Sequence, residues 1–173
     1  MTCSDPEGPV FMQNQIIMRP VTAADIAAVE ALHDLAFGPG RYARTAYRVR
    51  DGLPPFSPLC RVATLEGRIM AAVRMAPITI GEKPGAQLLG PLAVEPAIKG
   101  QGTGKALAAE AIAAARAAGE RLVLLVGDMP YYQRFGFAVA PRGKFDLGGP
   151  VDPARPEVIV TVRGIGYRYE ARA

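Results

Sequence analysis

Residues that hold metals or cross-link a chain are scarce in this sequence. Its 173 residues include one histidine, two cysteines and no tryptophan. His33, Cys3 and Cys60 are too few for a four-ligand zinc site, and they give no framework of disulfides. We therefore expect no metal, and a reducing cytoplasm as the natural location.

Long apolar runs are also missing. The longest aliphatic run is Leu122–Val126, whereas a helix needs about 20 apolar residues to cross a bilayer. The first residues carry Asp5 and Glu7 and no apolar stretch, which is not the pattern of a signal peptide. We therefore expect no membrane partner.

Charge of one sign forms no block. Lys and Arg number 20 against 16 Asp and Glu, which gives a formal net charge of +4 and a pI near 9.3. This balance favours anionic ligands by long-range attraction without naming one. A weak arginine cluster is not accompanied by an aromatic-rich basic patch; it consists of Arg41, Arg44, Arg48 and Arg50. A nucleic-acid partner is therefore not favoured.

Glycine and proline are abundant instead. The 19 glycines and 16 prolines make up about a fifth of the chain, which is above average usage but below the share typical of low-complexity sequence. Half of the residues are hydrophobic, so a chain of this length can form one compact core without disulfides or metals. We expect residues 1–15 to be a flexible leader and residues 16–173 to form a single domain.

The pattern of apolar residues predicts an α/β fold. Strands are expected at 16–18, 61–65, 69–80, 87–94, 122–126 and 157–162. Helices are expected at 23–37, 41–50 and 105–118, with a short helical stretch inside 127–137. The strand at 87–94, the helix after it and the apolar strand at 122–126 form one crossover unit at the centre of a mixed sheet.

The first predicted helix has a recognisable start and an apolar face. Thr22 is expected to be its N-cap, with Asp25 three residues later. Its apolar stripe is expected to contain Ile26, Val29, Leu32 and then Leu35 or Ala36. His33 is read as lying off this stripe, which favours a place on the surface.

Three alternating glycines stand between a predicted strand and a predicted helix. The segment reads Lys99-Gly100-Gln101-Gly102-Thr103-Gly104-Lys105. A dinucleotide fingerprint would need glycine at 105, and a P-loop would need glycine at 99 and a hydroxyl at 106, so neither pattern matches. The remaining interpretation is a loop whose backbone N–H groups bind a phosphate or pyrophosphate at a helix start. A glycine-rich helix cap without a ligand is the alternative.

Two motifs of the chain resemble the GNAT superfamily of N-acetyltransferases. The first is Leu92-Ala93-Val94-Glu95-Pro96 followed by the glycine loop, which is similar to the strand and [QR]-x-x-G-x-[GA] loop of that family. The second is Tyr131-Tyr132-Gln133-Arg134-Phe135-Gly136-Phe137, which has a tyrosine four residues before Gly-Phe. Their separation and the order of the predicted elements also agree with the family. Lys99 departs from the usual Arg or Gln, and lysine keeps the charge without the planar fork.

The resemblance implies a GNAT-like acyl-CoA acyltransferase fold, with a mixed central sheet and helices on both faces. It implies that acetyl-CoA is the co-substrate, bound by a strand and by the glycine loop. The implied strand residues are Leu92, Ala93 and Val94, and the implied loop residues are Lys99, Gly100, Gln101, Gly102, Thr103, Gly104 and Lys105. In such a site the strand backbone contacts the pantetheine arm, and an N–H near Val94 can stabilise the oxyanion.

Tyr132 stands where the family places the proton donor for the leaving thiolate. A phenol has a reference pKa of about 10, so it is protonated at neutral pH and can supply that proton. Tyr131 is expected to point elsewhere. Glu95 and Asp128 are candidates for a base that acts through water, but Asp128 fits the start of the short helix better, and the base is left unassigned.

The resemblance implies direct transfer of an acetyl group from acetyl-CoA to an amine of a small molecule or peptide, in a ternary complex. A non-catalytic domain that binds or senses acyl-CoA is the alternative, because it would keep the same loop. We expect the acceptor between residues 23–50 and the strands around Arg74 and Asp128, although no pattern identifies it. A homodimer is a further possible partner, common in the family and unmarked in this sequence.

Overall fold

A single sheet organises the described part of the chain. The computed structural model describes residues 15–43, 47, 50, 52–80, 83–140 and 158–161. The sheet order is β1-β2-β3-β4-β5-β7-β6. The strands are β1 (Ile17–Pro20), β2 (Arg61–Leu65), β3 (Arg68–Ile80), β4 (Lys83–Val94), β5 (Leu122–Val126), β6 (Phe137–Val139) and β7 (Val158–Thr161). The predicted leader, apart from Gln15, and residues 162–173 of the predicted domain lie outside the described residues.

The sheet is mixed, as the sequence predicts. β4 and β5 run parallel, whereas the other neighbouring pairs in the sheet are antiparallel. The predicted strands all occur, with β4 beginning four residues before the predicted start at 87. β6 was not predicted, because three residues are too few to show an alternating pattern.

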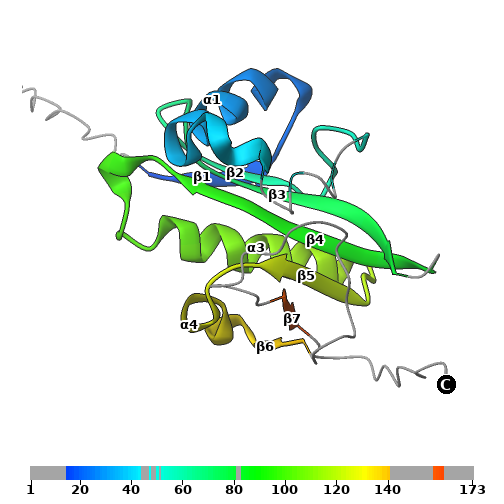
Figure 1. Ribbon diagram of the computed structural model, residues 1–173. Helices are drawn as coiled ribbons and strands as arrows, with labels where there is room; N and C mark the ends of the chain where they lie inside the picture. Colours follow the sequence, from blue (N-terminus) through cyan, green and yellow to red (C-terminus); the bar gives the residue numbers. More distant parts are fainter. Residues whose placement is uncertain are drawn as a thin grey trace, which may run out of the picture.

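Helices cover both faces of this sheet. Helix α1 (Ile26–Phe37) lies on one face and helix α3 (Thr103–Ala117) on the other, and each contacts β3 and β4 (Figure 1). The apolar face of α3 is buried through small and aliphatic side chains, namely Leu107, Ala108, Ala111, Ile112 and Ala115. These residues recur at three-to-four spacing, so one stripe of α3 packs on the sheet. The predicted placement of helices on both faces is therefore confirmed.

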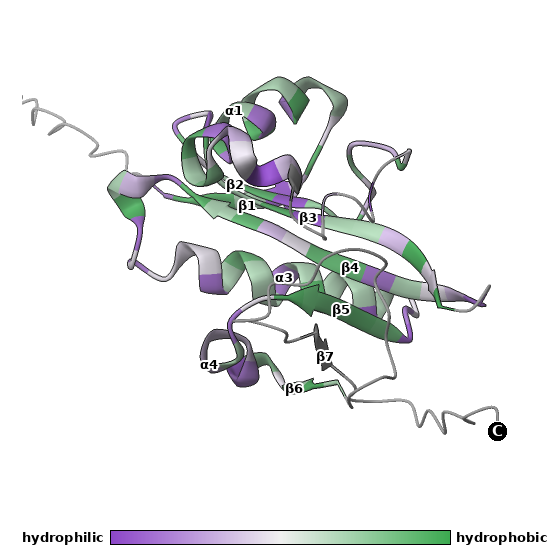
Figure 2. Ribbon diagram, viewed as in Figure 1, coloured by the Kyte–Doolittle hydropathy of each residue, from purple (hydrophilic) through white to green (hydrophobic). Residues whose placement is uncertain are grey.

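The central strand β5 is apolar along its length. Val123, Leu124 and Leu125 are almost fully buried, with relative exposures of 6%, 1% and 1%. Figure 2 shows β5 as one of the most hydrophobic segments of the sheet. Such an apolar run is expected of a strand that is covered on both faces. β5 lies beside β4, inside the sheet.

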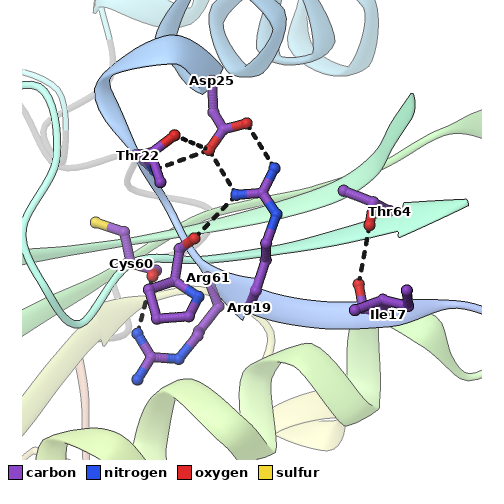
Figure 3. Close-up of polar contacts among 8 residues, drawn as sticks. Ile17, Arg19, Thr22, Asp25, Cys60, Arg61 and Thr64 are labelled. Carbon is purple, nitrogen blue, oxygen red and sulfur yellow. Dashed lines mark hydrogen bonds and ion pairs between the residues drawn. The ribbon is translucent and has the colours of Figure 1, made fainter. Parts of the chain in front are cut away.

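A polar network joins β1 to the start of α1. Asp25 accepts hydrogen bonds from the backbone N–H of Thr22 at 2.8 Å and from its hydroxyl at 2.7 Å (Figure 3). Arg19 of β1 donates both arms of its guanidinium to the same carboxylate, at 2.6 and 2.7 Å. Thr22 and Asp25 thus close the short turn η1 (Ala23–Asp25), which leads directly into α1. Thr22 is the N-cap of this turn, whereas the N-cap of α1 is Asp25 and not Thr22 as predicted.

Short helices make the remaining connections. They are η2 (Pro39–Ala43), η3 (Pro96–Ile98), α4 (Met129–Tyr132) and η4 (Gln133–Phe135). The expected short helix inside 127–137 is thus present, whereas the predicted helix at 41–50 falls partly on residues outside the description. Within the described ranges, no helix is long and apolar enough to cross a membrane.

Candidate functional site

The parallel strands β4 and β5 separate before either of them ends. Their paired residues run from Ala86 with Leu122 to Leu88 with Leu124. β4 continues for six residues past Leu88, to Val94, without pairing to β5. The backbone of Leu92–Val94 therefore keeps hydrogen-bonding groups on the side that faces away from β3. A linear ligand with amide groups can bind there as an added strand does.

The glycine loop lies at the start of α3, directly after β4. Gly100 and Gly102 have φ values of 87° and 89°, a left-handed conformation that only glycine adopts without strain. Gly102 is the N-cap of α3, and no side chain caps this helix end. A Cβ built on either glycine would meet nothing within 4 Å, so the backbone conformation alone requires glycine there.

The first turn of α3 presents unpaired backbone donors. Ala106 donates the first helical hydrogen bond, to the carbonyl oxygen of Gly102 at 3.0 Å. The N–H groups from Gly102 to Lys105 precede that bond, so geometry gives them no acceptor inside the helix. The side chains of Lys99 and Lys105 are exposed on either side of the loop. Converging N–H groups, a helix dipole and two ammonium groups fit a phosphate or pyrophosphate group.

Gly104 has a different role from the other two glycines of the loop. A Cβ at this position would lie 2.9 Å from Val94 Cγ2 and 3.9 Å from Leu92 Cδ2. No real Cβ tolerates the first distance, so glycine lets α3 approach β4 closely. This contact also shows that the side chains of Leu92 and Val94 face α3. The start of α3 is therefore held against the unpaired stretch of β4.

Two tyrosines of α4 lie beside this contact, and they point in different directions. The Tyr131 hydroxyl would be 3.6 Å from a Cβ on Gly104, so it reaches the first turn of α3. The Tyr131 hydroxyl thus lies at the glycine loop, while the ring of Tyr131 also contacts that of Tyr132. The two rings meet edge to face, with centroids 4.9 Å apart and planes at 81°. The arrangement holds both phenols at the same edge of β4 and β5.

Tyr132 packs into the wall of the site. Its ring edge lies over the backbone of Gly127, where a Cβ would come within 2.8 Å of Tyr132 Cε2. The same ring contacts Phe137 with centroids 5.7 Å apart. Burial, followed by the neighbouring Tyr131, raises the pKa of Tyr132 to about 12. The phenol is therefore protonated throughout the physiological range, as a hydrogen-bond donor must be.

The two candidate bases occupy unlike positions. Asp128 is the exposed N-cap of α4, and its backbone carbonyl accepts from the N–H groups of Tyr131 and Tyr132, each at 3.1 Å. The expectation that Asp128 starts this helix is confirmed, with the carbonyl rather than the carboxylate as acceptor. Glu95 is half-buried and follows Val94, with its N–H bound to the carbonyl oxygen of Met70 at 2.7 Å. Neither geometry assigns a base.

A cavity opens on the opposite face of the sheet, under α1. It holds about 320 Å³ of empty space, including the part that opens to solvent. Its walls come from α1, from the segment before β2 and from β3, and they include Glu30, His33, Phe56, Cys60, Val73 and Arg74. The cavity thus lies in the region where the sequence analysis expects the acceptor, between residues 23–50 and the strand that carries Arg74.

The expectation that His33 lies on the surface is wrong. His33 has a relative exposure of 1% and lines the cavity, whereas Leu35 is 59% exposed. Seven residues make almost two turns of an α-helix, so His33 lies nearly in line with Ile26, and Phe37 follows one turn later. Spacing counted from Ile26 would have found His33 on the buried face. Cys60, also buried in this region, is a free thiol.

Burial and nearby cations act together on His33. Desolvation, followed by the charges of Arg41, Arg74 and Arg50, lowers the pKa of His33 to about 4. The imidazole is therefore neutral at physiological pH. Arg50 and Arg74 were named in the sequence analysis only as part of a cluster and as a landmark, since an arginine's burial has no signature in local sequence.

Solved structures of similar fold bind coenzyme A. A GNAT family acetyltransferase from Brucella melitensis, solved with acetyl-CoA, superposes with a TM-score of 0.68 and 25% identity, covering 90% of this chain and 93% of that one. A GNAT family N-acetyltransferase from Escherichia coli, solved with CoA, gives a TM-score of 0.67 and 22% identity, covering 93% and 85% of the two chains.

The sequence comparisons give the family. No curated protein sequence matches the chain. The family model described as an acetyltransferase (GNAT) domain matches residues 18–140. That span runs from β1 to the end of β6 and contains the glycine loop, the unpaired stretch of β4 and both tyrosines of α4. The chain therefore belongs to the GNAT acetyltransferase family.

Proposed function

We propose that this protein is an N-acetyltransferase that moves an acetyl group from acetyl-CoA to an amine of a small molecule or peptide, by direct attack in a ternary complex. One observation carries the proposal. The start of α3, the unpaired stretch of β4 and the phenol of Tyr131 meet at Gly104, and Tyr132 is the next residue of α4. A pyrophosphate group, an amide-bearing arm and a thioester would each find a partner among these neighbouring features.

The residues can be given separate tasks. The loop of Lys99, Gly100, Gln101, Gly102, Thr103, Gly104 and Lys105 would bind the pyrophosphate through N–H groups and ammonium charges. The backbone of Leu92, Ala93 and Val94 would bind the pantetheine arm, and an N–H near Val94 would donate to the thioester oxygen as negative charge develops there. These tasks use the backbone, so the apolar side chains remain free to pack against α3.

Acetyl-CoA would supply a thioester whose carbonyl carbon accepts the amine nitrogen, with the C–N bond forming as the C–S bond breaks. Tyr132 would donate its phenolic proton to the departing sulfur, and its ring is held for this by Gly127 and Phe137. The proton of the attacking amine would leave to water, since no described side chain is placed as its base. No metal enters this scheme.

The test is acceptor-dependent release of CoA thiol. Purified protein is mixed with acetyl-CoA and a panel of primary amines, and binding of acetyl-CoA is measured in parallel by calorimetry. Turnover that requires both acetyl-CoA and one class of amine, with the acetylated amine found by mass spectrometry, supports the proposal. Tight binding of acetyl-CoA without turnover on any amine would instead identify a non-catalytic sensing domain.

A further inference from the structure

Arg50 is buried without a partner for its charge. Its relative exposure is 3%, and its Nε, Nη1 and Nη2 atoms are buried without a hydrogen bond. The guanidinium carbon lies 5.7 Å from the ring centroid of Tyr47, whose buried hydroxyl also lacks a partner. Burying an unpaired cation is strongly unfavourable. A ligand that supplies the missing anion would remove this penalty.

Arg50 lies beside β4, the strand whose backbone is proposed to bind the pantetheine arm. Its Nη2 atom would be 3.9 Å from a Cβ on Gly90, the same distance that separates this Cβ from the backbone nitrogen of Leu92. β4 bulges there, because Val73 pairs with Leu92 but Met75 pairs with Leu89. Arg74 stands between Val73 and Met75, opposite this bulge. The Arg50 guanidinium therefore lies at the point where β4 carries the proposed acetyl-binding backbone, and Arg74 belongs to the stretch of β3 that faces this point.

The other charges around the cavity do not neutralise Arg50 and Arg74. Glu30 and Asp34 of α1 are ion-paired with Arg41, at 2.7 and 2.5 Å. Arg74 donates one hydrogen bond, to the carbonyl oxygen of Pro54 at 2.8 Å, and its buried Nε lacks a partner. Within the described part of the chain, no acidic side chain forms an ion pair with either guanidinium group. Arg74 lines the cavity, and Arg50 is close enough to Arg74 and Cys60 of that lining for their charges to act on it.

His33, a neutral residue of the cavity, also has hydrogen-bonding groups without partners. Both ring nitrogens of His33 are buried and without a hydrogen bond. Burial, followed by the charge of Arg74, lowers the pKa of Arg50 to about 10, so Arg50 remains a cation at neutral pH. An anion that entered from the cavity would meet a guanidinium fork, a second guanidinium, and neutral N–H and O–H donors. A planar carboxylate matches the fork with two parallel hydrogen bonds.

We propose that Arg50, supported by Arg74, binds a carboxylate of the acceptor, so that the substrate is an amine that carries a carboxylate group. The inference deepens the proposed acetyl transfer and rests on it for the identity of the ligand as acceptor. The cavity under α1 would hold the body of the acceptor, and the bulge of β4 would bring its amine to the thioester. A carboxylate held at Arg50 would fix the register between the two substrates.

The experiment compares acceptors that differ only in the carboxylate. Amino acids with different amine-to-carboxylate distances are assayed beside their carboxamides and the matching aminoalkylphosphonates. The variants are Arg50→Gln and Arg50→Lys, with Arg68→Gln as control, because Arg68 is an exposed arginine on β3, the strand of Arg74. Thermal melting confirms that each variant folds. Binding of the best amino acid to the protein–CoA complex is measured by calorimetry, which needs no turnover.

We expect the amino acid to exceed its carboxamide and its phosphonate in kcat/KM by at least ten-fold. Arg50→Gln should remove this preference by raising KM and Kd for the amino acid at least ten-fold, with the carboxamide unchanged. Arg50→Lys should retain part of the preference, and Arg68→Gln all of it. If Arg50→Gln does not fold, the Arg50→Lys series and the wild-type binding data decide.

Several results would overturn the inference while leaving acetyl transfer intact. One is equal activity on amino acids and carboxamides in the wild-type protein. A second is a preference for the phosphonate. A third is a loss of kcat on every acceptor in Arg50→Gln, which would make Arg50 a donor to the thioester oxygen. Failure of the proposed acetyl transfer would look different from failure of this inference. In that case acetyl-CoA binds but no amine is acetylated. Calorimetry would still report whether a carboxylate binds at Arg50.

Discussion

The hydroxyl of Tyr131 lies 3.6 Å from the point where a side chain on Gly104 would begin, so a residue of α4 touches the first turn of α3. Tyr132, the next residue, turns its ring towards Gly127 and Phe137 instead. Two adjacent phenols thus contact different parts of the proposed site. One is close to the loop that would hold the pyrophosphate end of the cofactor, and the other belongs to the wall where sulfur would leave.

Removing each hydroxyl should therefore change a different kinetic constant. Tyr132→Phe should lower kcat by about 10- to 100-fold, since a proton donor to the leaving group contributes on this order, with little change in acetyl-CoA affinity. Tyr131→Phe should weaken acetyl-CoA binding several-fold and leave kcat near the wild-type value. Steady-state kinetics and calorimetry with acetyl-CoA measure both constants. Equal effects of the two substitutions would contradict the division of roles.

Gly102, at the start of α3, and Gly119, just after its end, allow a matched comparison. Gly102 and Gly119 both have positive φ, 89° and 77°, and both have open space where a Cβ would stand. Alanine at either position should destabilise the protein by about 1 kcal/mol, because it adopts this conformation with strain. Only Gly102→Ala should also weaken acetyl-CoA binding, since only Gly102 belongs to the loop whose N–H groups are proposed to bind the cofactor. A loss of binding in Gly119→Ala would show that the effect is one of stability.

Gly104→Ala should behave differently from Gly102→Ala. Its new methyl group would stand 2.9 Å from Val94 Cγ2, so α3 and β4 must move apart. Forcing a methyl group into such a contact typically destabilises by about 1–3 kcal/mol. We expect a lower melting temperature and, because β4 and the loop shift together, weaker acetyl-CoA binding. A melting temperature equal to that of the wild-type protein would contradict this account of the glycine.

The proposed cofactor half of the site can be located from sequence because the features that suggest it are local. The glycine loop, the strand before it and the tyrosine motif each occupy a few consecutive residues, and backbone conformation at Gly100 and Gly102 follows from residue type. The proposed acceptor half of the site could not be located in this way. Arg50, Arg74 and His33 come from three separate segments, and their burial depends on how α1 docks on β3 and β4.

A similar limit applies to the elements themselves. Long strands and helices with strong periodicity were located within a few residues, and β5 was placed at the bounds that the structure gives. β6 has only three residues, and its partner β7 lies far from it in the sequence. No local pattern therefore indicates that these residues form a strand. The predicted apolar stripe of α1 is wrong in the second half of the helix. Leu35 is apolar but exposed, whereas His33 is buried.

The contact between Arg19 and Asp25 should matter for acid stability. The hydrogen bonds from Arg19, opposed by partial burial and helped by Thr22, hold the pKa of Asp25 well below its usual range. The native state therefore resists protonation of this carboxylate more than the unfolded state does. Its stabilising effect is present above the unfolded pKa of about 4 and is lost as pH falls further. Asp25→Asn should lower stability at pH 7 and flatten the decline below pH 4, as measured by urea unfolding.

His33 should produce a separate loss of stability at higher pH. It is the one histidine of the sequence, and its pKa is lowered to about 4 by burial and then by Arg41, Arg74 and Arg50. Between its unfolded pKa of about 6.5 and pH 4, the unfolded chain binds a proton that the folded chain does not, so stability falls as pH falls. The groups facing it include Glu30, which is 3.8 Å from Nδ1 and is already paired with Arg41.

The size of this loss can be measured in a window where few other groups titrate. Lowering the pH from 7.5 to 5 should reduce the free energy of unfolding by about 2 kcal/mol through His33. In His33→Gln the same change of pH should cost much less, whatever the variant's stability at pH 7.5. Asp25→Asn is the control: it should lower stability by the same amount throughout this window and change the pH dependence only below about pH 4. An equal slope in wild type and His33→Gln would show that the imidazole is not held neutral in the folded protein.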